Sequence, residues 1–180
     1  MNEGLIPRRY AKALLKVAAE RHDGKRLYEL MGNLCDSFAA HSELEVTLAN
    51  PFIDSEKKIG LLATAAGADK SDTTFRDFLK LLKNNNRLDM ARAIALAYGD
   101  DYREANGIYR VEVTAAAPLD KEEEARLKSL IAEHLNGGTM EYTFKVNPDL
   151  IGGFTVTIGS EKLDTSVRNQ LKQLQLKLLG

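Results

Sequence analysis

The sequence predicts an α+β protein made of an N-terminal six-helix bundle over residues 1–105 and a small α+β domain over residues 106–180, with a short sheet and two helices. Three observations predict this fold class. Apolar residues recur every three or four positions through the first part, which is the spacing of helices that bury one face. At Asn106 and Gly107 that pattern stops, and apolar residues then alternate as they do in a strand. The chain closes with a Gly-Gly turn, another alternating segment and a leucine-rich segment.

Two helices are predicted first. Residues 7–21 carry a helical apolar stripe, and Pro7 is tolerated there because the first turn of a helix does not need its missing N–H. Residues 22–24 interrupt this helix, and a second stripe follows on residues 27–38. The first stripe consists of Tyr10, Ala11, Leu14, Leu15 and Ala18, and the second of Leu27, Leu30, Met31, Leu34 and Phe38.

Two short helices come next. Ser42 and Glu45 have the spacing of a capping box, and this helix must stop near Asn50 because the residue before Pro51 disfavours the helical conformation. The following helix begins within residues 54–55 and ends at Gly67, a residue type that accepts the left-handed conformation found after helices. Its inner face carries Ile59, Leu62 and Ala63.

The last two helices of the predicted bundle flank an asparagine-rich turn. One opens within residues 72–73 and is broken by residues 84–86, and the other runs over residues 88–105. Asn85 and Asn86 stand in this turn, where we expect asparagine to tolerate the left-handed conformation. The core positions are Phe75, Phe78, Leu79 and Leu82 in the first of these helices and Met90, Ile94, Ala97 and Tyr98 in the second.

The second part begins with an alternating strand up to Pro118. Asp120 and Glu123 then resemble a capping box, with Asp in the place of Ser or Thr, for a helix that ends at Gly137 and Gly138. A further alternating strand follows. The predicted inward residues are Tyr109, Val111, Val113 and Ala115 in the first strand, Leu127, Leu130, Ile131 and Leu135 in the helix, and Met140, Tyr142, Phe144 and Val146 in the second strand.

The closing segment predicts a hairpin and a final helix. A turn at residues 147–149 and the pair Gly152 and Gly153 lead into a strand, a tight turn at Gly159 and Ser160 reverses the chain, and residues 161–163 return as a second strand. Asp164, Thr165 or Ser166 can cap the final helix. That helix carries Val167, Leu171, Leu174 and Leu178 on one face.

Composition excludes several classes of protein. The chain holds 25 basic and 26 acidic residues, so it lacks the electropositive surface of a nucleic-acid or anionic-membrane binder. Its single cysteine, Cys35, forms no internal disulfide, which suits a reducing compartment. No apolar run is long enough to span a bilayer, and the N-terminal residues do not resemble a signal peptide. A cytoplasmic bacterial protein is expected.

The sequence indicates no catalytic residue, metal site, cofactor or small-molecule substrate. His22, His41 and His134 lie in separate elements, without further ligands at metal-binding spacing. Gly152 and Gly153 lead into a strand and not into a helix N-terminus, so they do not form a phosphate loop. Glu122, Glu123 and Glu124 are explained by the favourable helix dipole at a first turn.

Two helices carry more apolar surface than their own cores obviously need. The first helix is basic at its start and has a broad apolar face that includes Val17, which suggests contact with a partner helix; a purely central place in its own bundle explains that face equally well. The last helix has more leucine than one face can bury, which suggests a docking ridge.

Three ordered blocks of this sequence resemble the delta subunit of bacterial F-type ATP synthases, the relative of the mitochondrial oligomycin-sensitivity-conferring protein. The blocks are RRYAKALLKVA at residues 8–18, NNNRLDMARAIALAYGDDYREANGIYRVEVTAAAPL at residues 84–119, and NPDLIGGFTVTIGSEKLDTSVRNQLKQLQLKLLG at residues 147–180. The resemblance covers almost the whole chain.

The resemblance implies a non-catalytic stator subunit, which links the catalytic head to the b-type peripheral stalk so that rotation is coupled to ATP synthesis and to proton or sodium transport. The N-terminal bundle would hold the N-terminal helix of an α subunit against its first and fifth helices, near the β subunits. The C-terminal domain would join the b-type stalk subunits. The implied head contacts are Tyr10, Ala11, Leu14, Phe78 and Leu79, and the implied stalk contacts are Gly152, Gly153, Val167, Leu171, Leu174 and Leu178.

The implied location is the cytoplasmic face of the bacterial plasma membrane, as a peripheral part of the ATP synthase without membrane insertion. Two other classes of protein remain open from the residues alone. One is a helical adaptor unrelated to ATP synthase, and the other is a small ligand-binding protein or enzyme whose site is assembled from dispersed residues.

Overall fold

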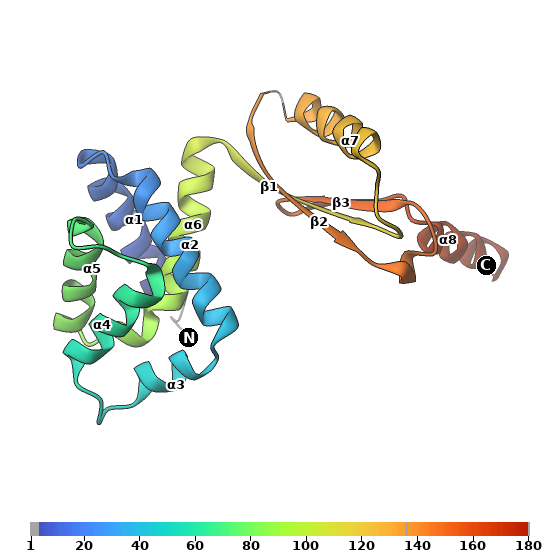
Figure 1. Cartoon of the computed structure of the whole chain (residues 1–180). Coiled ribbons are helices and arrows are strands. Elements are labelled where there is room, and N and C mark those ends of the chain that lie inside the picture. The colour runs from blue at the N-terminus through green and yellow to red at the C-terminus, as the bar shows by residue number, and fades with distance from the viewer. Residues whose placement is uncertain (1–3, 136, 180) are drawn as a thin grey trace. The chain divides into compact units, whose positions relative to one another are not determined.

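The computed structural model describes residues 4–135 and 137–179, and the chain divides into two compact units, residues 1–103 and 104–180. The first unit is helical and the second contains a four-stranded sheet (Figure 1), so the protein is of the α+β class.

The helical unit is built from helices joined by short turns. In chain order they are α1 (Leu5–Glu20), α2 (Gly24–Ala40), α3 (Glu43–Ala49), α4 (Ser55–Ala66), α5 (Thr73–Asn84), the short 3-10 helix η1 (Leu88–Met90) and α6 (Ala91–Asn106). Every one of them contributes to a single buried apolar cluster, in which Leu34, Leu62, Leu79, Ile94 and Tyr98 are fully enclosed. The helical stripes predicted from the sequence therefore face a common core.

Hydrogen bonds from α2 fix the neighbouring α4. Asn33 Nδ2 on α2 donates to the carbonyl of Ala66 at 3.2 Å, and Ser37 Oγ donates to the carbonyl of Ala65 at 2.8 Å. These carbonyls lie in the last turn of α4, where they lack partners within the helix. Gly67 follows in the left-handed conformation at φ 67°, as predicted for the end of this helix.

Two details of the predicted bundle are wrong. Ser42 does not cap α3 with its side chain, because its own backbone is already helical at φ −59° and ψ −24°. The segment that precedes α6 is a 3-10 turn at residues 88–90, so the α-helix begins only at Ala91. The asparagine turn behaves as expected, since Asn86 takes a left-handed φ of 51°.

The second unit is a mixed sheet with strand order β2-β1-β3-β4. Its elements are β1 (Ile108–Ala115), α7 (Lys121–His134), β2 (Thr139–Val146), the 3-10 turn η2 (Pro148–Leu150), β3 (Phe154–Ile158), β4 (Glu161–Asp164) and α8 (Val167–Leu179). Strands β1 and β2 pair in parallel with Val111 opposite Tyr142, and β1 pairs antiparallel with β3 with Val113 opposite Val156. Helix α7 forms the crossover between the parallel strands.

The core of this unit lies between α7 and one face of the sheet. Val111, Val113, Val156, Ile131 and Leu135 are buried there. Three predicted inward residues are exposed instead, and one of them is Val146 at the end of β2, which is 45% exposed. Leu130 is 57% exposed because the face of α7 that meets the sheet is the one with Leu127, Ile131 and Leu135, spaced four residues apart. Tyr109 is 43% exposed, and its ring lies over Gly138, where an added Cβ would come within 2.5 Å of it.

Both helices of the second unit begin with side-chain caps. Asp120 Oδ1 accepts from the backbone N–H of Glu123 at 2.7 Å while Glu123 Oε2 accepts from the backbone N–H of Asp120 at 3.1 Å, so the predicted capping box is confirmed. At the start of α8, Ser166 Oγ accepts from the backbone N–H of Asn169 at 3.2 Å. Ser166 is therefore the residue that caps the final helix.

Candidate docking surfaces

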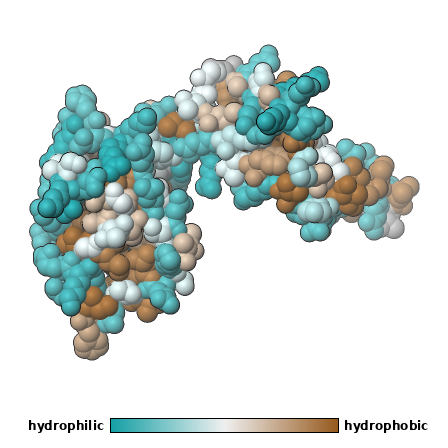
Figure 2. Space-filling view, viewed as in Figure 1, coloured by the Kyte–Doolittle hydropathy of each residue, from teal (hydrophilic) through white to brown (hydrophobic). Residues whose placement is uncertain are grey.

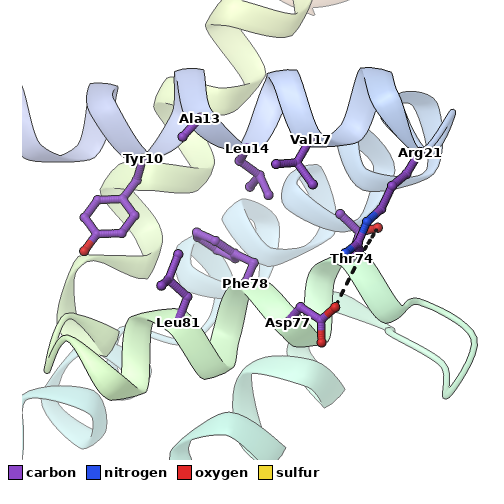
Figure 3. Close-up of a pocket in the computed structure, with 9 residues that line it drawn as sticks. All are labelled: Tyr10, Ala13, Leu14, Val17, Arg21, Thr74, Asp77, Phe78 and Leu81. Atoms are coloured by element: carbon purple, nitrogen blue, oxygen red, sulfur yellow. Dashed lines mark hydrogen bonds and ion pairs between the residues drawn. The ribbon is translucent and has the colours of Figure 1, made fainter.

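An apolar groove of about 310 Å³ lies between α1 and α5 of the helical unit (Figure 3). Leu14 and Val17 on α1 and Phe78 on α5 point toward one another across it. Phe78 is only 4% exposed and forms the floor, whereas Val17 is 37% exposed and Leu81 is 48% exposed at the sides. The groove is lined by Tyr10, Ala13, Leu14, Val17, Arg21, Thr74, Asp77, Phe78 and Leu81.

Polar contacts between the two helices close both ends of the groove. At one end Arg21 Nη1 donates to Asp77 Oδ2 at 3.2 Å and to Thr74 Oγ1 at 3.3 Å. At the other end Asn85 Nδ2 donates to the hydroxyl oxygen of Tyr10 at 2.9 Å. These contacts link α1 to α5 at both ends of the apolar strip.

The predicted head contacts fall into two groups. Tyr10, Leu14 and Phe78 line the groove. Ala11 and Leu79 are completely buried in the core. Each follows a groove-lining residue in the sequence, Tyr10 on α1 and Phe78 on α5. They can support the groove but present no exposed atoms to a partner.

Sequence reasoning did not single out Ala13, Thr74, Asp77 and Leu81 as groove residues. A signal for them existed, because positions 10, 13, 14, 17 and 21 of α1 and positions 74, 77, 78 and 81 of α5 follow the three-and-four spacing of one helix face. What the spacing could not supply is that the two faces meet and leave a gap, since that depends on how the helices pack.

A second apolar surface lies on α8. Leu171, Leu174 and Leu178 are 52%, 56% and 85% exposed, so the predicted leucine ridge is present and open to solvent. Figure 2 shows hydrophobic residues gathered over the end of this helix. Val167, at the start of the ridge, is half-buried.

The predicted glycine pair anchors the start of α8. A Cβ at Gly152 would lie 2.9 Å from Cγ2 of Val167, and a Cβ at Gly153 would lie 2.6 Å from the carbonyl oxygen of Thr165. The carbonyl of Gly152 also accepts from the backbone N–H of Val167 at 3.0 Å. Gly153 has a φ of 72°, a conformation that favours glycine. The two glycines thus allow the turn to touch the helix.

The described residues offer neither a metal-binding cluster nor an activated cysteine. No group of three or more His, Cys, Asp or Glu side chains among them is placed to hold a metal ion. Burial raises the pKa of the Cys35 thiol, which disfavours the reactive thiolate. Across the same residues, no helix has the length and apolar character needed to cross a membrane. The fold and its two apolar surfaces define a class of protein that acts by docking other proteins.

Comparison with known proteins identifies the family. The model of the ATP synthase delta (OSCP) subunit family matches residues 6–178, so the chain belongs to that family. The ATP synthase subunit delta of Phocaeicola vulgatus is 35% identical over 177 residues, covering 98% of this chain and 95% of the relative. The subunit delta of Desulfovibrio desulfuricans is 35% identical over 173 residues, covering 95% and 94%.

A solved structure shares the fold. A chain in the cryo-EM structure of the Toxoplasma gondii mitochondrial ATP synthase hexamer matches with a TM-score of 0.75 at 21% identity, over 97% of each chain. Family membership makes this chain a structural, non-catalytic subunit of the peripheral stalk of F-type ATP synthase, as the sequence led us to expect. The unrelated adaptor and the ligand-binding protein are no longer needed as explanations.

Proposed function

We propose that this chain is the joint at the top of the stator, with the helical unit bound to the catalytic head and the sheet unit bound to the b-type stalk. The observation that carries this proposal is the presence of two separate apolar surfaces, the α1–α5 groove and the α8 ridge, on two compact units of one chain. A linker between two large bodies needs such a pair of surfaces.

For the head, the proposed occupant of the groove is the N-terminal helix of an α subunit. From Tyr10 to Arg21 the groove follows α1 for roughly 16 Å, about three helical turns at 1.5 Å per residue. An amphipathic helix of that length presents apolar side chains at positions i, i+3 or i+4 and i+7, which match the open strip over Phe78. Tyr10, Leu14 and Phe78 would contact it, with Ala11 and Leu79 as the packing beneath.

The domain plan expected from the sequence fits this assignment. We take residues 1–105 as a six-helix bundle that docks the head near the β subunits and residues 106–180 as the domain that docks the stalk. Leu171, Leu174 and Leu178 would contact the stalk directly, and Val167 would lie at the edge of the contact. Gly152 and Gly153 would act by fixing the turn against α8.

The work done by this subunit is mechanical. Rotation of the central shaft would carry the catalytic head with it unless the stator held the head to the membrane sector, which we place with this chain on the cytoplasmic face of a bacterial membrane. A joint under cycling load needs slow dissociation, which corresponds to nanomolar affinity or about 12 kcal/mol. Coupling of rotation to proton or sodium transport depends on this joint.

Co-purification from native membranes tests the proposal. A tagged chain, extracted gently enough to leave the ATP synthase intact, should bring down the α, β and b-type subunits together. A second sample with Leu81→Asp should retain the b-type subunits and lose the α and β subunits. Recovery of the wild-type chain without any of these subunits would contradict the proposed function.

A further inference from the structure

Ile151 has a backbone conformation that is unusual for its residue type. Its φ is 67° and its ψ is −39°, close to the classic γ-turn, which is rare and strained for a residue with a branched Cβ. Its side chain is 66% exposed, so burial in the unit's own core does not compensate for the strain. Glycine would adopt this conformation freely, so the backbone alone does not require isoleucine.

The surrounding turn holds Ile151 in place. Its N–H donates to the carbonyl of Pro148 at 3.0 Å, and on its other side the carbonyl of Gly152 accepts from the N–H of Val167 at 3.0 Å. The N–H of Asp149 donates to Asn147 Oδ1 at 3.0 Å. The turn is thus tied both to η2 and to the first residue of α8, and the isoleucine side chain is left projecting into solvent.

Helix α8 continues the apolar surface beside this turn. Element η2 packs against α8, and Val167, Leu171, Leu174 and Leu178 follow at steps of four, three and four. This is the spacing of a heptad seam, in which apolar residues of one helix pack against those of a second helix. Leu171, Leu174 and Leu178 are 52%, 56% and 85% exposed, so none of the described residues of this chain covers the seam.

The charges of α8 indicate what kind of helix would cover the seam. The helix holds Arg168, Lys172 and Lys177 and no acidic residue. In a heptad with Leu171 at position a, Arg168 and Lys177 fall at the flanking e and g positions, and Gln170 and Gln175 occupy the others. A second copy of α8 would bring no negative charge to these cations.

We infer that Ile151 and the α8 seam form one surface that binds a single amphipathic helix with acidic residues along its flanks, with Ile151 as an apolar anchor at the edge. This inference rests on the proposed stalk docking and specifies how it occurs. Ile151 precedes Gly152, whose carbonyl accepts from the N–H of Val167 at the start of the seam, so the turn fixes the backbone of the isoleucine next to the seam before a partner binds.

The test compares binding and stability in the same variants. The probe is the water-soluble part of the b-type subunit from the same ATP synthase, titrated against the full chain by calorimetry. Ile151→Gly removes the side chain and relieves the backbone, so we expect Kd to rise about tenfold while Tm stays equal or rises. Leu130→Ala, which truncates another exposed aliphatic residue, 57% exposed on α7, should leave Kd within twofold.

A second test asks whether acidic residues flank the apolar face of the partner helix. The double variant Arg168→Glu and Lys177→Glu should weaken binding and should reverse the effect of added salt from weakening to strengthening. If the wild-type chain binds and Ile151→Gly or the charge variant binds equally well, the inference is wrong although stalk docking stands. If the wild-type chain fails to bind, or forms dimers through α8 in its place, stalk docking and the inference both fail.

Discussion

Gly152 and Val167 touch so closely that no larger residue fits at position 152: an added Cβ would lie 2.9 Å from Cγ2 of Val167. This contact, together with the hydrogen bond between their backbones, fixes the start of α8 against the turn that precedes β3. The apolar ridge of α8 is therefore presented from a fixed base.

Gly152→Ala should loosen that base. The added methyl group must displace Val167 or the turn, and we expect a loss of about 1–3 kcal/mol in the free energy of unfolding of the sheet unit. Denaturant unfolding measures it, and limited proteolysis should cut α8 first. Gly32→Ala on α2, where a Cβ meets nothing within 4 Å, is the control and should stabilise the protein by about 0.5–1 kcal/mol. A neutral Gly152→Ala would show that the contact is not rigid.

Ser166→Ala should weaken the start of α8. Ser166 is 1% exposed, and its hydroxyl accepts from the N–H of Asn169 at 3.2 Å and donates to Asp164 Oδ1 at 2.6 Å. Loss of a side-chain cap costs about 1 kcal/mol, which denaturant unfolding of the variant should show. Ser129→Ala on the exposed side of α7 is the matched control, and an equal effect from both variants would contradict the assignment of Ser166 as the cap.

Leu81→Asp should separate head binding from folding. Leu81 is 48% exposed at the side of the groove, so the change should alter the free energy of unfolding by less than about 1 kcal/mol. A carboxylate that faces an apolar partner helix should nevertheless weaken head binding at least tenfold, which corresponds to about 1.4 kcal/mol. The measurement is the affinity for the isolated catalytic head. Leu96→Asp on α6, 51% exposed and outside the groove, should bind normally.

Phe78→Ala should behave differently from Leu81→Asp. Because Phe78 is 4% exposed and belongs to the buried cluster as well as to the groove floor, its truncation should destabilise the helical unit by about 3–5 kcal/mol. Thermal unfolding would report this loss. A folded Phe78→Ala variant of normal stability would mean that Phe78 serves the groove alone.

Asp72→Asn should lower the stability of the helical unit in a pH-dependent way. Arg26 donates to both carboxylate oxygens of Asp72 at 3.0 Å, and the side chain of Asp72 is only 8% exposed. The hydrogen bonds from Arg26 lower the pKa of Asp72 below its ordinary value. A carboxyl group with a lower pKa in the folded state stabilises the fold above its unfolded pKa of about 3.9, and this contribution is lost as the pH falls through the folded value.

The Tm of Asp72→Asn should therefore lie below that of the wild-type chain at pH 7, and the gap should close as the pH is lowered toward 3. Asp36→Asn, an exposed substitution on α2, provides the comparison. A gap that stays constant between pH 7 and pH 3 would show that the charge of Asp72 does not contribute.

Local sequence patterns predicted helices and strands well where an element buries one apolar face or begins with a recognisable cap. The stripe from Leu27 to Phe38 predicted α2, and the Asp120–Glu123 spacing predicted the capping box that the structure contains. The alternation at Phe154 to Ile158 predicted the hairpin strand β3. In each case the periodicity or spacing is a direct consequence of backbone geometry.

Features that depend on packing between elements could not be predicted in this way. The parallel pairing of β1 with β2 follows from the crossover through α7 and leaves no local pattern. Leu130 fits a helical stripe but lies beside the face that the sheet covers. The groove residues Ala13 and Leu81 and the positive φ of Ile151 likewise depend on how neighbouring segments meet.

Reconstitution of the joint tests the central claim most directly. The isolated catalytic head, the water-soluble part of the b-type subunit and this chain are mixed, and native mass spectrometry records which complexes form. We expect a ternary complex with the wild-type chain, a complex with the stalk alone for Leu81→Asp, and a complex with the head alone for Leu174→Asp. Loss of both partners in either variant, or a head and stalk that associate equally well without this chain, would contradict the claim.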